Sequence, residues 1–259
     1  MSGYFCRRNM AAMITATKKN PAEKILGRFG LYLTRRESLG GSKAILGSHP
    51  PYDQLNAIGT RNDYFIHKGY RHRSVPQYMD DTVYSWGWQE EVYCLAREIA
   101  DKHDFKSVMD VGCGSAFKLL KYLGKDKTIG LDVAQTCSKL RNRYPDREWG
   151  VADFSAEIVP KADLVIASDV IEHLVDPDML LRFILRVAPK HVIISTPDRN
   201  LLRHGTHNGP PHNIAHIREW NMPELHAYLS EFLEIDEHFI SYAAQATQCV
   251  LARPRSACS

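Results

Sequence analysis

The stretch DVGCGSAFKLL, residues 110–120, joins the end of a short apolar run to the beginning of a helical pattern. Its two glycines, Gly112 and Gly114, allow the backbone of this turn to approach a ligand closely. The helix start behind them offers free N–H groups to an anion. The stretch therefore predicts a strand, a ligand-binding turn and a helix in immediate succession, which is one unit of an α/β fold.

The same alternation of short apolar runs and helical stretches continues on both sides of this unit. Alternating strands and helices predict a mostly parallel sheet that helices cover on both faces. The last two runs are joined by a short connection, so we expect them to pair as an antiparallel hairpin at one edge. The predicted fold is thus a doubly wound, Rossmann-like sheet of seven strands. Strands are expected at residues 107–111, 128–133, 148–154, 162–170, 191–196, 233–243 and 247–254, and helices at 88–103, 116–124, 135–144, 177–188 and 221–232.

The first third of the chain differs from the rest in pattern and in charge. We expect residues 1–85 to form a basic extension or cap, with one helix near residues 22–33, and residues 86–259 to form the domain that holds the sheet. Residues 1–80 contain 13 Lys and Arg against 5 Asp and Glu, whereas the remainder contains 20 against 25. Such a basic arm suits phosphates, a membrane surface or an anionic substrate, or else salt bridges to the acidic body.

Composition excludes several classes of protein. No apolar run approaches the roughly 20 residues that span a bilayer, and the N-terminus has no signal-peptide pattern. The six cysteines are scattered without a CxxC pair, which argues against a disulfide framework and against a zinc site. We therefore expect a cytoplasmic protein with reduced thiols and no transmembrane segment. Nothing in the sequence indicates an oligomeric state.

Acidic residues stand at the ends of three predicted strands, which is where ligands bind in an open parallel sheet. Asp110 precedes the first glycine, and Asp132 ends the second strand. A carboxylate at Asp132 can accept hydrogen bonds from both hydroxyls of a ribose. Asp153 followed by Phe154 suits an adenine, since the acid accepts from the exocyclic amine and the ring packs on the base. A nicotinamide-binding turn is not indicated, because its third glycine would stand where this chain has Phe117.

These motifs resemble those of the class I S-adenosylmethionine-dependent methyltransferases. DVGCGSAFKLL is similar to their first motif, GLDV to their second, and ADF and SDVIEHLVDP to their third and fourth. The resemblance covers about residues 86–254 and implies S-adenosylmethionine as the cofactor. One departure is Ala116, where the family often has glycine. The residues implied to bind the cofactor are Asp110, Gly112, Gly114, Asp132, Val133, Asp153, Phe154, Ser168 and Asp169.

The fourth motif, SDVIEHLVDP at residues 168–177, carries the candidates for chemistry at the methyl group. Methyl transfer from a sulfonium is an in-line displacement, in which the protein aligns the acceptor and often removes its proton. If the chain turns helical at Asp169, then Asp169, Glu172 and His173 cluster, whereas Glu172 points away if the strand continues. Three interpretations stay open: a structural turn, His173 as a general base, and a metal site.

A second group of candidates lies in RHGTHNGPPHNIAHIREW, residues 203–220, a long connection that holds four of the twelve histidines. It is either a solvated loop or a functional one that adds His216 as a base or a metal ligand. The set Asp169, Glu172, His173 and His216 is similar to a motif of the small-RNA 3′-terminal 2′-O-methyltransferases. In that family two acids and two histidines hold a divalent metal, so the resemblance implies Mg²⁺ or Mn²⁺ at these four residues. Asp169 departs from the family pattern, which has Glu there.

The methyl acceptor is less sharply indicated. The pattern VIEHL-x-DP also resembles quinone O-methyltransferases, and residues 67–93 resemble bacterial methyltransferases that act on sugars or lipid-linked glycans. In that second stretch, Tyr70, Arg71, Arg73 and Tyr78 form either a lid or a packing arm. We expect O-methylation of a hydroxyl on a glycan or a small metabolite. The alternatives are a non-catalytic cofactor-binding subunit and an RNA ribose 2′-O-methyltransferase, which is not favoured because the basic arm lacks interleaved aromatic residues.

Overall fold

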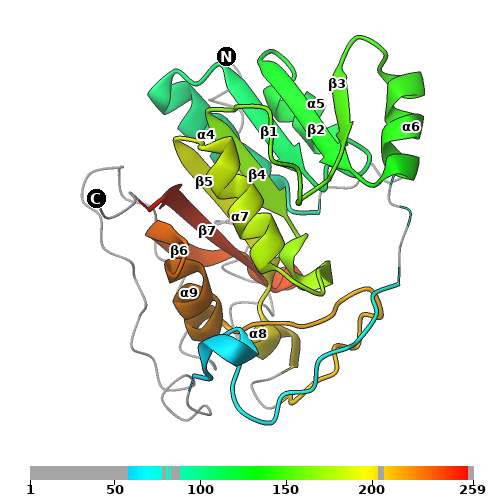
Figure 1. Ribbon diagram of the computed structural model, residues 1–259. Helices are drawn as coiled ribbons and strands as arrows, with labels where there is room; N and C mark the ends of the chain where they lie inside the picture. The colour runs from blue at the N-terminus through cyan, green and yellow to red at the C-terminus, as the bar shows by residue number, and fades with distance from the viewer. Residues whose placement is uncertain (1–57, 78–79, 81, 83–87, 204–206, 256–259) are drawn as a thin grey trace.

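The computed structural model describes residues 58–77, 80, 82, 88–203 and 207–255. These residues form one seven-stranded sheet in the order β3-β2-β1-β4-β5-β7-β6 (Figure 1). Strands β1 to β5 run parallel, and β7 lies antiparallel between β5 and β6. The predicted doubly wound sheet with an antiparallel hairpin at one edge is confirmed. The strands are β1 Ser107–Val111, β2 Lys127–Asp132, β3 Glu148–Val151, β4 Leu164–Ser168, β5 His191–Pro197, β6 Leu233–Tyr242 and β7 Thr247–Pro254.

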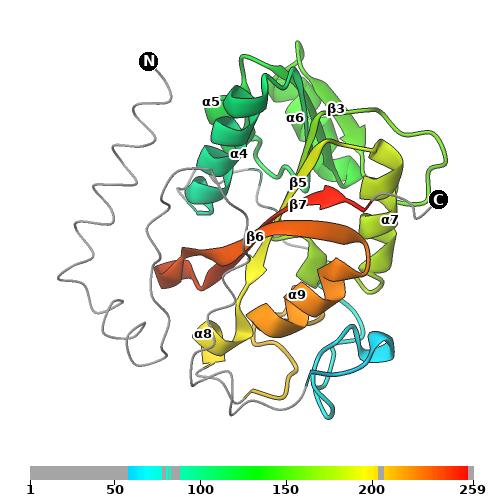
Figure 2. The same ribbon diagram turned by 90° about the vertical axis from the view of Figure 1, so that its left-hand side faces the viewer.

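Helices cover both faces of this sheet, because the buried strands present apolar side chains to each face in turn. In β4, Leu164 and Ile166 pack against α4 and α5, whereas Val165 and Ala167 pack on the opposite side, where α7 and α9 lie (Figure 2). The result is a three-layer α/β/α arrangement. The helices are α4 Glu90–His103, α5 Phe117–Leu123, α6 Ala134–Arg143, α7 Asp178–Val187, α8 Arg199–Arg203 and α9 Met222–Ser230.

The strand order brings the turn after β1 and the turn after β4 close together at the carboxyl ends of the strands. After β1 the chain moves outward through β2 and β3, and then it returns to form β4 on the other side of β1. The turn after β1 and the turn after β4 therefore face each other at the carboxyl ends of adjacent parallel strands. Ligands of open α/β sheets bind at such a switch in strand order.

Local signals explain which helix boundaries were predictable. The start of α9 has a capping box, in which the Asn221 side chain accepts from the Glu224 N–H and the Glu224 carboxylate accepts from the Asn221 N–H. Helix α8 was not predicted, because its five residues are too few to show a helical period. The helix expected near residues 22–33 lies outside the described residues.

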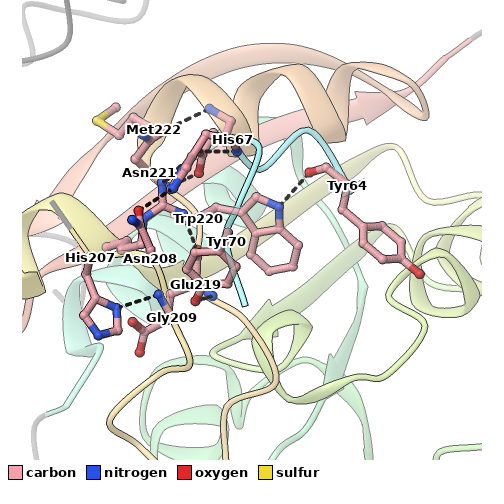
Figure 3. Close-up of polar contacts among 12 residues, drawn as sticks. Tyr64, His67, Tyr70, His207, Asn208, Gly209, Glu219, Trp220, Asn221 and Met222 are labelled. Atoms are coloured by element: carbon pink, nitrogen blue, oxygen red, sulfur yellow. Dashed lines mark hydrogen bonds and ion pairs between the residues drawn. The ribbon is translucent and has the colours of Figure 1, made fainter. Parts of the chain in front are cut away.

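Residues 58–77, the described part of the predicted extension, pack on the sheet domain (Figure 3). Ile66 and Tyr70 are buried and belong to the same apolar cluster as α7 and α9. The Trp220 indole N–H donates to the Tyr64 carbonyl at 3.0 Å, and His67 contacts the Glu224 carboxylate at 3.0 Å. Residues 58–77 therefore contribute Ile66 and Tyr70 to the hydrophobic core of the sheet domain.

Cys113, Cys137 and Cys249 are buried and form no disulfide, whereas Cys94 is disulfide-bonded. The expectation that all six cysteines are reduced is therefore wrong at Cys94, since spacing along the chain does not reveal which thiols approach each other in the fold. Among the described residues, no helix has the length and apolarity needed to cross a membrane.

Candidate active site

The glycine turn after β1 has the backbone conformation that its sequence predicts. Gly112 and Gly114 have φ values of 73° and 52°, in the left-handed region that glycine adopts without strain. Gly112 also lies so close to Val170 that an added Cβ would be 2.4 Å from Val170 Cγ2. Ala116, which the resemblance marked as a departure from glycine, has φ 58°. The left-handed conformation at Ala116 carries an energetic cost that glycine would not have.

Asp132 fixes this turn to the end of β2. Its Oδ2 accepts from the Gly114 N–H at 2.8 Å, and its Oδ1 accepts from the Val133 N–H at 2.7 Å. A carboxylate offers about four acceptor positions, so these two bonds leave capacity for ligand hydroxyls. Val133 is exposed beside it, as is Val151 at the end of β3, which pairs with Asp132.

Asp153 and Phe154 lie in the turn after β3, which ends at Val151 and is therefore three residues shorter than predicted. Hydrogen bonds from the Ser155 hydroxyl and N–H hold the pKa of the exposed Asp153 below its ordinary value. Phe154 is half-buried, and its ring centroid is 5.5 Å from that of Phe183. Asp110 is placed differently: it is fully buried, and its Oδ2 accepts from the Tyr93 hydroxyl at 3.0 Å.

Ser168 and Asp169 belong to a hydrogen-bonded network at the end of β4. Ser195 on β5 shares a 2.9 Å hydrogen bond with Ser168 and donates to Asp169 Oδ1 at 3.0 Å. The Gln89 amide donates to Asp169 Oδ2, and Lys118 donates to Gln89 Oε1 at 3.1 Å. Both carboxylate oxygens of Asp169 are thus used by side chains from β5 and from the start of α4.

The turn after Asp169 is a short 3₁₀ helix, Ile171–His173, which follows a left-handed φ of 53° at Asp169. This turn buries Glu172 completely, and neither of its carboxylate oxygens has a hydrogen-bond partner among the described residues. Burial and the neighbouring Asp169 raise the pKa of Glu172 to about 8. A buried carboxylate without partners is rare in folded proteins and indicates a missing proton or cation.

Two histidines lie beside this carboxylate. The His173 Nδ1 is 2.8 Å from the Ala215 carbonyl, which only accepts, so Nδ1 carries the proton and Nε2 carries the lone pair of the neutral ring. The His173 Nε2 is 4.0 Å from Glu172 Oε1, and the His173 and His216 rings are 4.8 Å apart and nearly perpendicular. One ligand atom from each of Glu172, His173 and His216 lies within 4.8 Å of the others. We call these three residues the Glu–His–His cluster.

The expected set of four residues is therefore a set of three. Asp169 is not a member of the cluster, because the left-handed turn directs its carboxylate to Gln89 and Ser195 instead. His216, on a distant loop, lies beside Glu172 and His173 in the fold, and a metal-binding or catalytic role for the three residues stays a prediction. Two imidazoles and a partnerless buried carboxylate form a donor set that fits a divalent cation.

The other histidines of residues 203–220 do not join the cluster. His207 and His212 contact each other, with ring centroids 5.1 Å apart, and His204 lies outside the described residues. Sequence reasoning also gave no role to Glu219, which is fully buried and contacts the His216 Nδ1 through Oε1 at 2.9 Å. Its position three residues after His216 in the sequence was the available signal.

Two arginines of residues 58–77 form hydrogen bonds to the backbone of the histidine-containing loop at residues 207–220. The Arg73 N–H donates to the Ile217 carbonyl at 2.8 Å, and its side chain donates to the carbonyls of Pro211 at 2.6 Å and His216 at 3.3 Å. Arg71 donates to the Gly209 carbonyl at 3.1 Å. Tyr70 is buried, so Tyr70 and Arg73 act as a packing arm, and Tyr78 lies outside the described residues.

A family model described as a methyltransferase domain matches residues 88–246. No curated protein sequence matches the chain significantly. Three solved structures share its fold: a S-adenosylmethionine-dependent methyltransferase from Clostridium acetobutylicum (TM-score 0.51, 12% identity, 64% of this chain and 92% of that one), the methyltransferase domain of bacterial CtHen1 (0.50, 18%, 65% and 99%) and the PH0226 protein from Pyrococcus horikoshii (0.50, 16%, 76% and 100%).

At these identities the solved structures show likeness of fold alone, whereas the family model covers more than half of the chain. The strand order, with β7 antiparallel, and the glycine turn after β1 are the features that the sequence led us to expect of this family. The chain therefore belongs to the methyltransferase-domain family, as a class I S-adenosylmethionine-dependent enzyme.

Proposed function

We propose that the enzyme methylates a hydroxyl group on a glycan or a small metabolite. The observation that carries the proposal is the Glu–His–His cluster, which stands at the end of β4 next to the glycine turn after β1. A hydroxyl needs help to lose its proton, and imidazole nitrogens supply that help near neutral pH. An amine that is already neutral needs no such group, so the cluster favours oxygen as the acceptor atom.

The cofactor residues have separate tasks in this proposal. S-adenosylmethionine, when bound, supplies a methyl group that its sulfonium has already activated. The backbone at Gly112 and Gly114 lets the ligand approach the sheet edge, and Asp132 accepts from the ribose hydroxyls while it holds the turn. Val133 and Phe154 give apolar contact to the base, and Asp153 accepts from its amine. Asp110, buried under the turn, supports it through Tyr93.

The cluster can act in two ways on the acceptor. The Nε2 lone pair of His173 can accept the proton of the hydroxyl directly. Alternatively, Glu172, His173 and His216 would hold a divalent metal, which would supply Lewis-acid help to the loss of the hydroxyl proton. The partnerless carboxylate of Glu172 supports the metal, because a cation would compensate its buried charge. Since Mg²⁺ prefers oxygen ligands, the two imidazoles favour Mn²⁺.

A second candidate acceptor is the terminal ribose of an RNA, because a cation on this cluster would suit a diol. The described arginines give it little support. Arg71, Arg73 and Arg218 all donate to backbone carbonyls of the protein, so these side chains are committed to holding loops. Nucleic-acid binding instead requires a surface of cations that can reach phosphates.

We also propose a cytoplasmic location. The proposal is supported by Cys113, Cys137 and Cys249, which are buried outside disulfides, and the disulfide at Cys94 argues against it. Labelling of cysteines in protein taken directly from cells, with and without reductant, tests the point, since a reduced Cys94 is expected there.

Calorimetry tests the proposed function. S-adenosylmethionine is titrated into the protein with EDTA, and then a methyl glycoside and a short RNA with a terminal diol are titrated with and without Mn²⁺. Metal-independent cofactor binding with Mn²⁺-dependent glycoside binding is expected. Mn²⁺-dependent binding of the RNA alone would move the assignment to RNA, and cofactor binding with no effect of Mn²⁺ would leave His173 as the base.

Variants locate the effect within the site. His173→Ala and His216→Ala should abolish the Mn²⁺ effect and leave the affinity for S-adenosylmethionine unchanged. His212→Ala is the matched control, because His212 is exposed on the same loop and lies outside the cluster. Loss of cofactor binding in either cluster variant would contradict the separation of cofactor and acceptor sites.

A further inference from the structure

His216 is held by a different partner on each ring nitrogen. Its Nδ1 is 2.9 Å from Glu219 Oε1, and its Nε2 is 2.9 Å from the Asn213 side-chain nitrogen. The Asn213 oxygen accepts from the Ala215 N–H at 3.0 Å, which fixes the orientation of the amide. The amide nitrogen, which only donates, therefore faces the His216 Nε2.

This arrangement determines the proton position on His216. Since Nε2 accepts from Asn213, the proton of the neutral ring lies on Nδ1, where it is donated to the buried Glu219 carboxylate. A carboxylate behind Nδ1 is also the arrangement that orients a metal-binding histidine and raises its basicity. Glu219 thus keeps the proton on Nδ1, which leaves a lone pair on Nε2. The Asn213 amide donates a hydrogen bond to that lone pair.

We infer that Asn213 is a removable cap on His216, so that a metal ion or a substrate proton gains the Nε2 lone pair only when the Asn213 side chain moves away. Asn213 is exposed and lies on the loop, whereas Glu219 is fully buried. The cap can therefore move without disturbing the core, but Glu219 cannot. Both are positioning residues that act through His216 in opposite directions. The inference rests on the proposed function in one respect: it assumes that the Glu–His–His cluster is the working site.

Opposite effects on metal affinity test this inference. Co²⁺ binding is followed by its visible absorption in the absence of cofactor and acceptor. Asn213→Ala removes a competing hydrogen bond and should tighten Co²⁺ binding about two- to tenfold. Glu219→Gln removes the orienting carboxylate and should weaken it about 10- to 100-fold. Ile214→Ala, an exposed neighbour of Asn213 with no ligand atom, should leave the affinity unchanged.

A second readout does not depend on metal. In metal-free protein, ¹⁵N NMR of the histidine rings should show the His216 Nε2 resonance moving toward that of an unbonded nitrogen in Asn213→Ala. An unmoved resonance would overturn the inference, as would Co²⁺ affinity in Asn213→Ala no higher than in the unmodified protein when that protein binds Co²⁺. If neither protein binds Co²⁺, the metal part of the proposed function fails, and the resonance alone decides whether Asn213 caps the lone pair.

A gain in affinity distinguishes a cap from a structural residue. Loss of a merely structural contact loosens the loop and weakens binding, whereas loss of a competitor strengthens it.

Discussion

Gly112 and Val170 fit against each other so closely that a Cβ at Gly112 would lie 2.4 Å from Val170 Cγ2. Gly112 belongs to the turn after β1, and Val170 directly precedes the 3₁₀ helix that carries Glu172 and His173. The turn proposed to bind the cofactor and the turn proposed to bind the acceptor are therefore in direct van der Waals contact. A substitution that displaces one of these turns is expected to displace the other.

Replacing Gly112 with alanine should destabilise the protein in two ways. A left-handed alanine costs about 1–2 kcal/mol, and the overlap with Val170 adds about 1–3 kcal/mol. Gly69→Ala is the matched control, since Gly69 has φ 90° but no atom within 4 Å of the added Cβ. Urea unfolding should show a larger loss of unfolding free energy for Gly112→Ala than for Gly69→Ala. Adding Val170→Ala to Gly112→Ala should remove the part of that loss that comes from the overlap. Equal losses in the two single variants would contradict the contact.

Asp132→Asn should weaken the binding of S-adenosylmethionine without unfolding the domain. The amide keeps the shape of the carboxylate, but one of its two acceptors is replaced by a donor that faces the N–H of Gly114 or Val133. Losing a charged hydrogen bond corresponds to a drop in affinity of about 10- to 100-fold. Calorimetry measures this drop, and Asp146→Asn, at an exposed position, should show none.

Arg73→Ala should affect the acceptor side of the site selectively. It removes the side-chain bonds to the carbonyls of Pro211 and His216, and each is worth about 0.5–3 kcal/mol. We expect severalfold weaker Co²⁺ binding together with unchanged affinity for S-adenosylmethionine. Arg71→Ala, which loses only the bond to Gly209, should have a smaller effect on Co²⁺. Equal weakening of metal and cofactor binding would indicate general loss of structure instead.

His238 should make the protein sensitive to acid. Burial lowers the pKa of His238 from 6.5 to about 3, so between these values the unfolded chain binds a proton that the folded protein excludes. Stability from this residue is complete above pH 6.5 and falls as the pH drops toward 3, by about 2 kcal/mol at pH 5.

His238→Gln tests that pH dependence. Glutamine does not titrate and can still donate to Gln248 Oε1, the partner of His238 at 3.0 Å. Urea unfolding at pH 7 and pH 5 should show a smaller loss of stability in this variant than in the unmodified protein. His212→Gln, at an exposed position, should leave the loss unchanged.

The periodic spacing of apolar residues in the sequence predicted most of the strands and helices. The strands from β1 to β7 and the helices α4, α5, α6, α7 and α9 were predictable because each has a repeating apolar pattern or a recognisable cap. The boundary drawn at residue 85 could not reveal that Ile66 and Tyr70 enter the core. These two residues lie in a stretch without period, and only the tertiary fold supplies their partners.

The candidate site was predictable where spacing alone brings residues together. Glu172 and His173 are neighbours in the chain, and Asp132 follows a strand that runs beside β1. The contacts of Asp169 with Gln89 and Ser195 could not be predicted, because they depend on tertiary structure and on a left-handed φ that an aspartate only occasionally adopts. Glu219 and Asn213 were overlooked because their roles depend on which nitrogen of His216 each one contacts.

The position of β7 has a consequence for how the chain is made. Strand β6 pairs only with β7 in this sheet, and β7 is synthesised after it. On the ribosome, β6 therefore emerges before its place in the sheet exists, and β5 stays an open, apolar edge in the meantime. The sheet closes only once residues 247–254 have left the exit tunnel. Until then the edge of β5 that β7 covers in the folded protein is open to pairing with other chains.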